Sequence, residues 1–458
     1  MTKGASSKMR KKWQKQTPLM DCIGDHPQAQ ELEAISKIID KNSNICDLVL
    51  QDLSDRLKTA QTSGAEGMSA DQVLRCTIIK ILFGFTYQEL AFHIVDSRSI
   101  RRFCHIGIAD EGFKKSTLNS NIKAISDITW EAINKQILGY AEEEKTEKGR
   151  EVRIDCTVVE SNIHPPSDST LLWDGVRVLT RLLHRAKAHF GLSRLHFKDH
   201  QRVAKRRMVT IQYAKSNKAR KQPYKDLLKV TKKCVGYANT AIELISQSSY
   251  SIEDKAFLDD LKGFVELTLK VIDQTERRVI RGESVAASEK VVSLFEPHTD
   301  IIKKDNRDIF YGHKICLTGG KSNLILDCLI VDGNPADVDL TETMLDRQNE
   351  LYGRYPLKAA LDGGFASKEN LEKAKSKQIK DVCFAKKRGL KVADMCRSEY
   401  VYKRLRRFRA GIESGISWLK RSFGLHRCTW KGYDSFKSYV WAAIVSANLL
   451  TIARKQMP

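Results

Sequence analysis

The chain has 458 residues, a length that suits two or three structural units. Its hydrophobic content of 41% and charged content of 29% are those of an ordinary folded protein, but 78 Lys and Arg against 56 Asp and Glu give a net charge of +22. This excess favours a polyanionic partner, and nucleic acid before a membrane surface, because we find no signal-peptide pattern and no long uncharged apolar run.

The first 27 residues are predicted to form a basic arm. Residues 1–20 are rich in Lys and Arg and poor in core-forming side chains. Such an arm can lie along phosphates or can be a solvated tail, and both interpretations stay open.

Residues 28–145 are predicted to form a helical domain. Apolar residues recur at helical spacing from Val73 onward. Thr86 and Glu89 have the spacing of a capping box, which predicts a second helix, and Ser116 is a candidate cap for a third. Short helices joined by tight turns suit a DNA-binding helix-turn-helix, but they suit any small helical bundle equally well.

A buried strand is predicted next, over residues 150–163 (REVRIDCTVVESNI). It is rich in β-branched residues, yet it carries Asp155 in its middle. A charge inside a core strand is costly unless it is paired or holds a metal. The simpler alternative is an aspartate at the strand end, hydrogen-bonded to a loop.

Helical periodicity then continues over about 168–290, which predicts a helical insertion after the first strand. Its segment 200–229 concentrates positive charge, including Lys205, Arg206 and Arg207, with little acid to balance it. This segment is either a helix that follows DNA phosphates or simply a solvated face.

Strand patterns return in the last third of the chain. Two of them, separated by Gly-Gly-Lys-Ser, predict a hairpin. The remaining elements alternate between helix and strand, which predicts an α/β fold with a mixed sheet. The predicted strands are 310–320, 323–334, 356–365 and 379–387; the predicted helices begin at about 337 and cover 367–378 and 408–424; and the apolar stretch 439–453 is predicted to be a core helix.

Three acids stand out. Asp155 and Asp362 lie in predicted strands, and Glu413 lies on a predicted helix where Arg409, Glu413 and Lys420 fall within roughly 60° of one another. That helix could also be an ordinary amphipathic helix with an exposed acid. Together, however, three carboxylates suit hard divalent cations, and two ions ~3.5–4 Å apart can drive phosphodiester chemistry. A basic surface would supply the polyanion for such a site.

These blocks give the sequence its resemblance to DDE-type transposases of bacterial insertion sequences, most closely to the ISNCY group. The resemblance covers MSADQVLRCTIIKILFGFTYQELAFHIVDS in the helical region, RIDCTVVESNIHPPSDSTLLWDGVRVL at the first aspartate, FEPHTDIIKKDNRDIFYGHKI at the hairpin and LDGGFAS at the second aspartate. The family's Tyr, Arg, Glu, Lys signature is matched by Arg409, Glu413 and Lys420. Its tyrosine position is Arg406 here, with Tyr402 one turn earlier.

The resemblance implies a ribonuclease-H-like catalytic domain over 146–458, with a helical DNA-binding domain before it. It also implies that Asp155, Asp362 and Glu413 are catalytic and bind two Mg²⁺ ions, for which Mn²⁺ can substitute. Arg409 and Lys420 would then hold DNA.

The implied reaction is hydrolysis at the ends of the element, followed by attack of the freed 3′-hydroxyl on target DNA. The implied partner is double-stranded DNA, as terminal inverted repeats and as target, bound by a homodimer. Eleven scattered cysteines without a zinc pattern favour the reducing cytoplasm, where such a protein would associate with the nucleoid. Two alternatives stay open: a catalytically silent DNA-binding protein derived from a transposase, and a nuclease of the same fold that acts on RNA or junctions.

Overall fold

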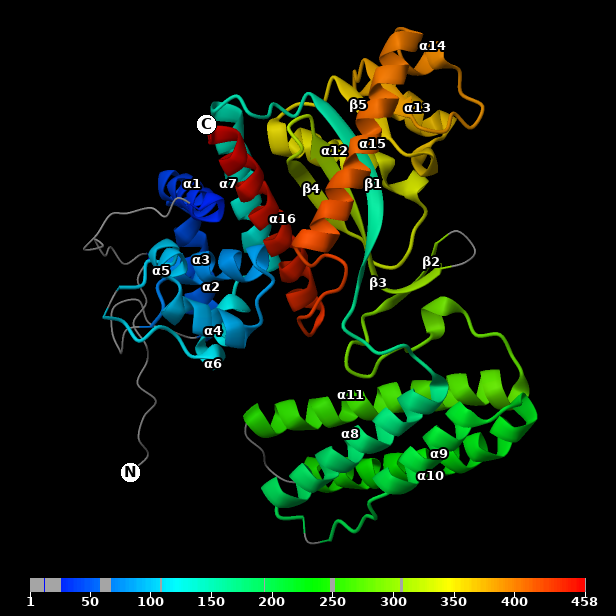
Figure 1. Cartoon of the computed structure of the whole chain (residues 1–458). Coiled ribbons are helices and arrows are strands. Elements are labelled where there is room, and N and C mark those ends of the chain that lie inside the picture. Colours follow the sequence, from blue (N-terminus) through cyan, green and yellow to red (C-terminus); the bar gives the residue numbers. More distant parts are fainter. Residues whose placement is uncertain are drawn as a thin grey trace. The chain divides into compact units, whose positions relative to one another are not determined.

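The computed structural model describes residues 12, 26–57, 67–107, 109–192, 194–247, 252–304 and 308–457. The predicted basic arm therefore lies outside the described residues, apart from Lys12, His26 and Pro27. The chain divides into two compact units (Figure 1). The first unit comprises residues 1–160 and 313–458, and the second unit comprises residues 161–312.

The first unit begins with helices, as the sequence predicts. Thr86 caps α4 in a full capping box, because its hydroxyl accepts from the amide of Glu89 and the Glu89 carboxylate accepts from the amide of Thr86. The prediction that Ser116 is a cap is wrong: the N-cap of α6 is Lys114, whose side chain makes no capping bond. The helices are α1 (Pro27–Lys41), α2 (Ile45–Leu57), α3 (Ala70–Leu82), α4 (Tyr87–Asp96), α5 (Arg98–Phe103), α6 (Lys115–Ile122) and α7 (Asp127–Glu143).

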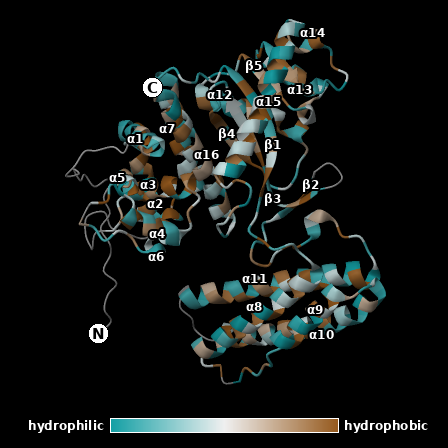
Figure 2. Ribbon diagram, in the orientation of Figure 1, coloured by the Kyte–Doolittle hydropathy of each residue, from teal (hydrophilic) through white to brown (hydrophobic). Residues whose placement is uncertain are grey.

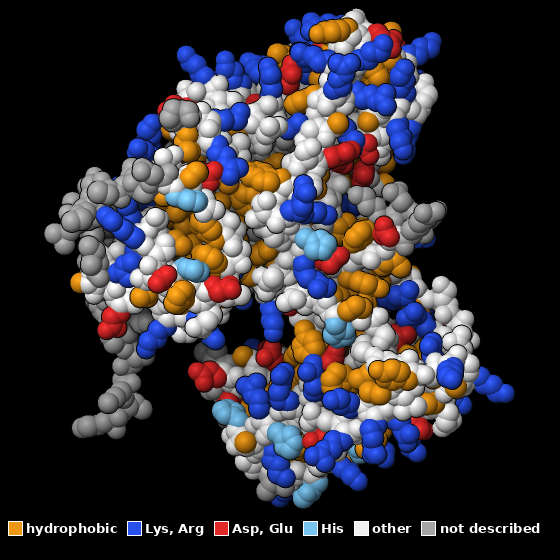
Figure 3. Space-filling model, in the orientation of Figure 1, with side chains coloured by type: hydrophobic (Ala, Val, Ile, Leu, Met, Phe, Trp, Pro, Cys, Tyr) orange, Lys and Arg blue, Asp and Glu red, His pale blue; other side chains and the backbone are white. Residues whose placement is uncertain are grey.

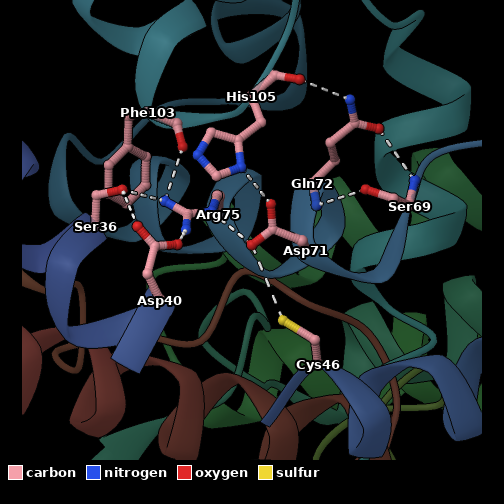
Figure 4. A network of polar contacts seen from close by, with 9 residues as sticks. All are labelled: Ser36, Asp40, Cys46, Ser69, Asp71, Gln72, Arg75, Phe103 and His105. Atoms are coloured by element: carbon pink, nitrogen blue, oxygen red, sulfur yellow. Dashed lines mark hydrogen bonds and ion pairs between the residues drawn. The ribbon is translucent and has the colours of Figure 1, made fainter. Parts of the chain in front are cut away.

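A buried ionic network joins α1, α3 and the residues around the end of α5 (Figure 4). The Arg75 guanidinium is fully buried and lies 2.6 Å from both Asp71 and Asp40, and it also donates to the carbonyl of Phe103. His105 lies 2.7 Å from the other oxygen of Asp71. Burial raises the pKa of the Asp71 carboxyl, but the bonds from His105 and Arg75 outweigh it and hold that pKa below its ordinary value.

A mixed sheet with helices against it forms the rest of the first unit, so the predicted α/β fold class is confirmed. Within this unit the sheet order is β3-β1-β5-β6, and β4 also pairs with β3. The pairs β1/β5 and β5/β6 are parallel, while β3/β4 is the predicted antiparallel hairpin. The elements are β1 (Glu151–Glu160), β3 (Asp308–Gly320), β4 (Ile325–Ile330), η3 (Asp337–Leu340), α12 (Thr341–Tyr352), β5 (Lys358–Leu361), η4 (Gly363–Phe365), α13 (Lys368–Ser376), β6 (Asp381–Phe384), α14 (Val392–Met395), α15 (Glu399–Ser422) and α16 (Tyr433–Gln456).

Helix α16 is the predicted core helix. It is long and apolar enough to cross a membrane, but 89% of its most apolar 18-residue window is buried inside the protein. Asn448 in this helix bonds both to Asn134 of α7 and to the backbone of Ile325 in β4. These contacts fasten the helical region and the sheet to one core element of the first unit.

The second unit is the predicted helical insertion. Four long helices enclose a hydrophobic core of their own, and Figure 2 shows hydrophobic and hydrophilic residues alternating along them, as an amphipathic bundle requires. The sequence did not predict the short strand β2, whose five residues include Asp300, Lys303 and Lys304 and so show no apolar alternation. The elements are α8 (Asp168–His189), α9 (Gln201–Tyr213), α10 (Asn217–Ser246), α11 (Ile252–Thr275), the π-helical turn η1 (Glu276–Arg281), η2 (Ala287–Glu289) and β2 (Asp300–Lys304), which pairs with the beginning of β3.

Candidate active site

Strand β1 turns a row of polar side chains toward helix α15. Side chains two residues apart share one face of a strand, so Glu151, Arg153 and Asp155 point the same way. Glu151 accepts from Arg404 at 2.7 Å, and Arg153 donates to the carbonyl of Phe408 at 3.1 Å. Figure 1 shows α15 lying along β1 in the first unit. These side chains hold α15 on β1 through contacts at successive turns of the helix.

Arg409 is the point where the predicted acids meet. Its Nη2 atom lies 2.9 Å from Asp155 Oδ2 and 3.1 Å from Asp362 Oδ1, and its Nη1 atom lies 2.5 Å from Glu413 Oε1. One acid comes from the middle of β1, one follows the end of β5, and one lies on α15 a turn beyond Arg409. The structure therefore brings Asp155, Asp362 and Glu413 together around a single guanidinium group.

The cluster is graded from buried to open. The side chain of Asp155 is 14% exposed, that of Asp362 is 37% exposed and that of Glu413 is 60% exposed, while Arg409 is 13% exposed. Three carboxylates against one guanidinium leave a formal charge of −2 in this cluster. This net negative charge attracts further cations, most strongly at Asp155, where few solvent molecules screen it.

The donor set suits a divalent metal ion, but its present spacing suits the guanidinium. Among the described residues, no group of three or more His, Cys, Asp and Glu side chains is close enough to hold an ion. Magnesium takes carboxylate oxygens at about 2.0–2.1 Å, closer than these oxygens lie to Arg409. Arg409 thus stands where a cation would bind, and the three carboxylates could hold a metal ion only after the guanidinium withdraws.

The glycines after β5 are needed for close packing. A Cβ atom on Gly363 would lie 2.6 Å from the side chain of Lys386, and one on Gly364 would lie 2.8 Å from Asp337. Both distances are shorter than non-bonded atoms tolerate, so the chain beside Asp362 can approach its neighbours only as glycine. The two glycines that follow Asp362 therefore have a clear packing cause.

The sequence alone did not indicate the role of Arg153. Arg153 is 6% exposed, stacks 4.9 Å from the ring of Phe408 and donates to Asn323 at 2.6 Å. Its guanidinium lies directly against the Cα of Gly411, where a larger residue would collide with it. An arginine in an apolar strand was the available signal, but the sequence offered no partner for it.

The other residues of the predicted signature occupy different surroundings. Lys420 is half-buried on α15, eleven residues beyond Arg409, and Arg406 is exposed. Tyr402 is buried, and its hydroxyl donates to the carbonyl of Phe384 at 3.1 Å, so it fastens α15 to β6.

The predicted DNA-contacting residues of the insertion lie on α9 in the second unit. Lys205 and Arg206 are exposed, and Arg207 lies 3.5 Å from Asp226 of α10. Asp168 begins α8 and binds Gln274 and Arg278 within the same unit. It therefore stabilises the helical insertion.

Two families match the chain. Residues 288–449 match the family described as "Transposase DDE domain", and residues 21–124 match the family described as "Transposase domain (DUF772)". The first match includes Asp362 and Glu413 but begins after Asp155. A DDE domain implies a ribonuclease-H-like core, in agreement with the mixed six-stranded sheet. No curated protein and no solved structure matches the chain.

Proposed function

We propose that this chain, which carries two transposase domains, catalyses the movement of an insertion sequence. It would cut DNA at the ends of the element and join these ends to target DNA. One observation carries the proposal: Asp155, Asp362 and Glu413 converge on one cationic group, although they come from three separate elements. Chain segments so far apart rarely bring three carboxylates together unless a cation is to be held there.

In this proposal the three acids hold two Mg²⁺ ions, for which Mn²⁺ can substitute. Bound there, such ions would activate the attacking oxygen and stabilise the leaving oxygen of a phosphodiester. Arg409 withdraws from the carboxylates and donates both Nη groups to a DNA phosphate, a bidentate geometry that guanidinium groups favour. Lys420, on the same helix, adds a second positive charge for the DNA.

Both proposed reactions are in-line phosphoryl transfers at one site. Water first cuts the phosphodiester at the element's end, and the freed 3′-hydroxyl then attacks a target phosphodiester. Neither step needs a covalent enzyme intermediate, so the protein's own residues only position the two DNA strands and balance charge.

The proposed reactions also imply a partner, an oligomeric state and a place of action. The partner is double-stranded DNA, as terminal inverted repeats and as target, and exposed Lys205 and Arg206, with Arg207, contribute to holding it. Two ends must be joined together, which suits a homodimer on DNA. The place of action is the cytoplasm, on the nucleoid.

Cleavage of a plasmid that carries the DNA flanking the gene tests this function. We expect nicks at the element's ends that require Mg²⁺ or Mn²⁺, and their loss in Asp155→Asn, Asp362→Asn and Glu413→Gln, with DNA binding retained. Asp394→Asn is the matched control, because Asp394 is an exposed acid of the first unit on α14. Specific cutting by all three site variants would refute the assignment of these acids.

A second function has one observation in its favour. Arg409 separates the acids, and no group of metal-binding size is present among the described residues. A chain fixed in this arrangement would bind transposon ends without cutting them. Binding of the ends without any strand breaks in Mg²⁺ or Mn²⁺ would favour this silent DNA-binding protein.

A further inference from the structure

One side of α10 in the second unit is covered by lysines. Six of them fall within about 120° of one another around the helix, on the side opposite to the buried residues Tyr224, Leu227 and Thr231. All six are exposed. We call this surface the lysine face; it consists of Lys218, Lys221, Lys225, Lys229, Lys232 and Lys233.

The lysine face has little acid to balance it. Residues 200–235 contain twelve Lys and Arg and one acid, Asp226, a net charge of +11 and thus half of the chain's +22. Among the residues that the structure describes, one ion pair involves the lysine face, between Lys232 and Glu276 at 2.7 Å. On the side of the second unit visible in Figure 3, Lys and Arg predominate over Asp and Glu.

Part of the lysine face lines a groove. Lys225, Lys229, Lys232 and Lys233 line about 480 Å³ of open space, together with Leu228 of α10 and with Glu276 and Ile280 of the π-helical turn η1. Ammonium groups one helical turn apart repel one another, and this repulsion destabilises a helix unless an anion enters. The arrangement therefore suits a ligand with several negative charges.

The length of the lysine face distinguishes a polymer from a small anion. Lys233 lies fifteen positions after Lys218, which corresponds to about 22 Å along the helix. A single phosphate group cannot use such a row, whereas duplex DNA presents phosphates repeatedly over that distance. Lysines act as point charges, so they neutralise a backbone without reading bases.

We propose that the lysine face of α10 binds the phosphate backbone of double-stranded DNA without regard to sequence. This binding site rests on the proposed function for the choice of DNA as the polyanion. It gives the helical insertion a task of its own, which is to hold duplex DNA by charge.

The test is the salt dependence of binding to an arbitrary duplex, measured with the full chain. We compare K225Q/K229Q/K233Q with the control K187Q/K255Q/K262Q, which removes the same charge from exposed lysines elsewhere on the second unit. Each lost phosphate contact makes the negative slope of log K against log salt shallower by about 0.9. The slope of the lysine-face variant should therefore be shallower than that of the wild type by about 2–3. Its affinity in moderate salt should fall at least tenfold, while the control keeps nearly the wild-type slope.

Two outcomes contradict the proposal. An unchanged slope in the lysine-face variant, or an equal loss in the control, refutes the lysine face as the binding surface. Circular dichroism and urea unfolding check that both variants fold. We expect them to fold because glutamine has nearly the same helix propensity as lysine. If the slope of the lysine-face variant is unchanged while the protein still cuts the element's ends with metal ions, the lysine face alone is refuted. If the slope falls only in the lysine-face variant but the wild-type protein never cuts DNA, the lysine face is supported and the proposed function is contradicted.

Discussion

Arg409 of α15 and Asp155 of β1 form a 2.9 Å ion pair across 254 residues of sequence. The same guanidinium holds Asp362 and Glu413. The position of every acid in the cluster therefore depends on Arg409.

Arg409→Gln should increase the response of the protein to metal ions. Without the guanidinium, the three carboxylates repel one another, and the metal-free protein should lose about 1–2 kcal/mol of stability. Divalent ions no longer compete with Arg409, so Mg²⁺ or Mn²⁺ should raise Tm more in the variant than in the wild type. Thermal unfolding with and without each ion, in the absence of DNA, measures this directly.

Arg404→Gln is the matched control for that experiment. Arg404 lies on the same helix and pairs with Glu151, away from the three acids. It should lower stability without changing the metal-induced shift of Tm. An equal shift in wild type and in Arg409→Gln would mean that Arg409 does not occupy the ion's place.

Two glycines of α15 should respond in opposite directions to alanine. A Cβ atom at Gly411 would collide with the guanidinium of Arg153, whereas at Gly415 it would meet nothing within 4 Å. Gly415→Ala should therefore stabilise the protein by about 0.5–1 kcal/mol through helix propensity. Gly411→Ala should destabilise it, because Arg153 must leave the carbonyl of Phe408. Urea unfolding of both variants decides; stabilisation by both would show that Arg153 does not hold the helix.

These contacts show what the sequence could predict and what it could not. Enrichment in β-branched residues made β1 predictable, and the turn residues did the same for the β3/β4 hairpin, because such patterns are local. The role of Arg153 was not predictable, since its partners Asn323 and Phe408 lie 170 and 255 residues away. The three acids were singled out by their chemistry, but Arg409 was expected to contact DNA alone, because sequence spacing does not reveal that its guanidinium lies between the three carboxylates.

The buried network of α3 should make the first unit sensitive to Asp71→Asn. Removing one partner leaves Arg75 buried with less compensation, at a cost of about 3 kcal/mol. Replacing both residues, in Asp71→Asn with Arg75→Met, should cost less than the sum of the single changes, because no unpaired charge is left. Additive losses in urea unfolding would contradict a coupled pair.

The lowered pKa of the Asp71 carboxyl predicts that the protein loses stability in acid. The folded-state pKa of Asp71 lies below its ordinary value of 3.8, so its contribution is complete above that pH and is lost as pH falls through the lowered pKa. The stability difference between wild type and Asp71→Asn should therefore shrink below about pH 4. Parallel stability curves down to pH 2 would exclude this role for the carboxyl.

Lys80 of α3 should make the stability of the protein depend on pH in the alkaline range. Burial, with a smaller effect from the charge of Lys123, lowers the pKa of Lys80 to about 8, and its ammonium donates to the carbonyl of Phe85 at 2.9 Å. The unfolded chain binds this proton more tightly than the folded chain, so stability rises with pH between about 8 and 10.5. Relative to Lys80→Met, the wild type should gain about 2–3 kcal/mol over that range, because titrations common to both proteins cancel. Urea unfolding at pH 7 and pH 10 measures the difference, and a constant gap would show that Lys80 keeps its charge without penalty.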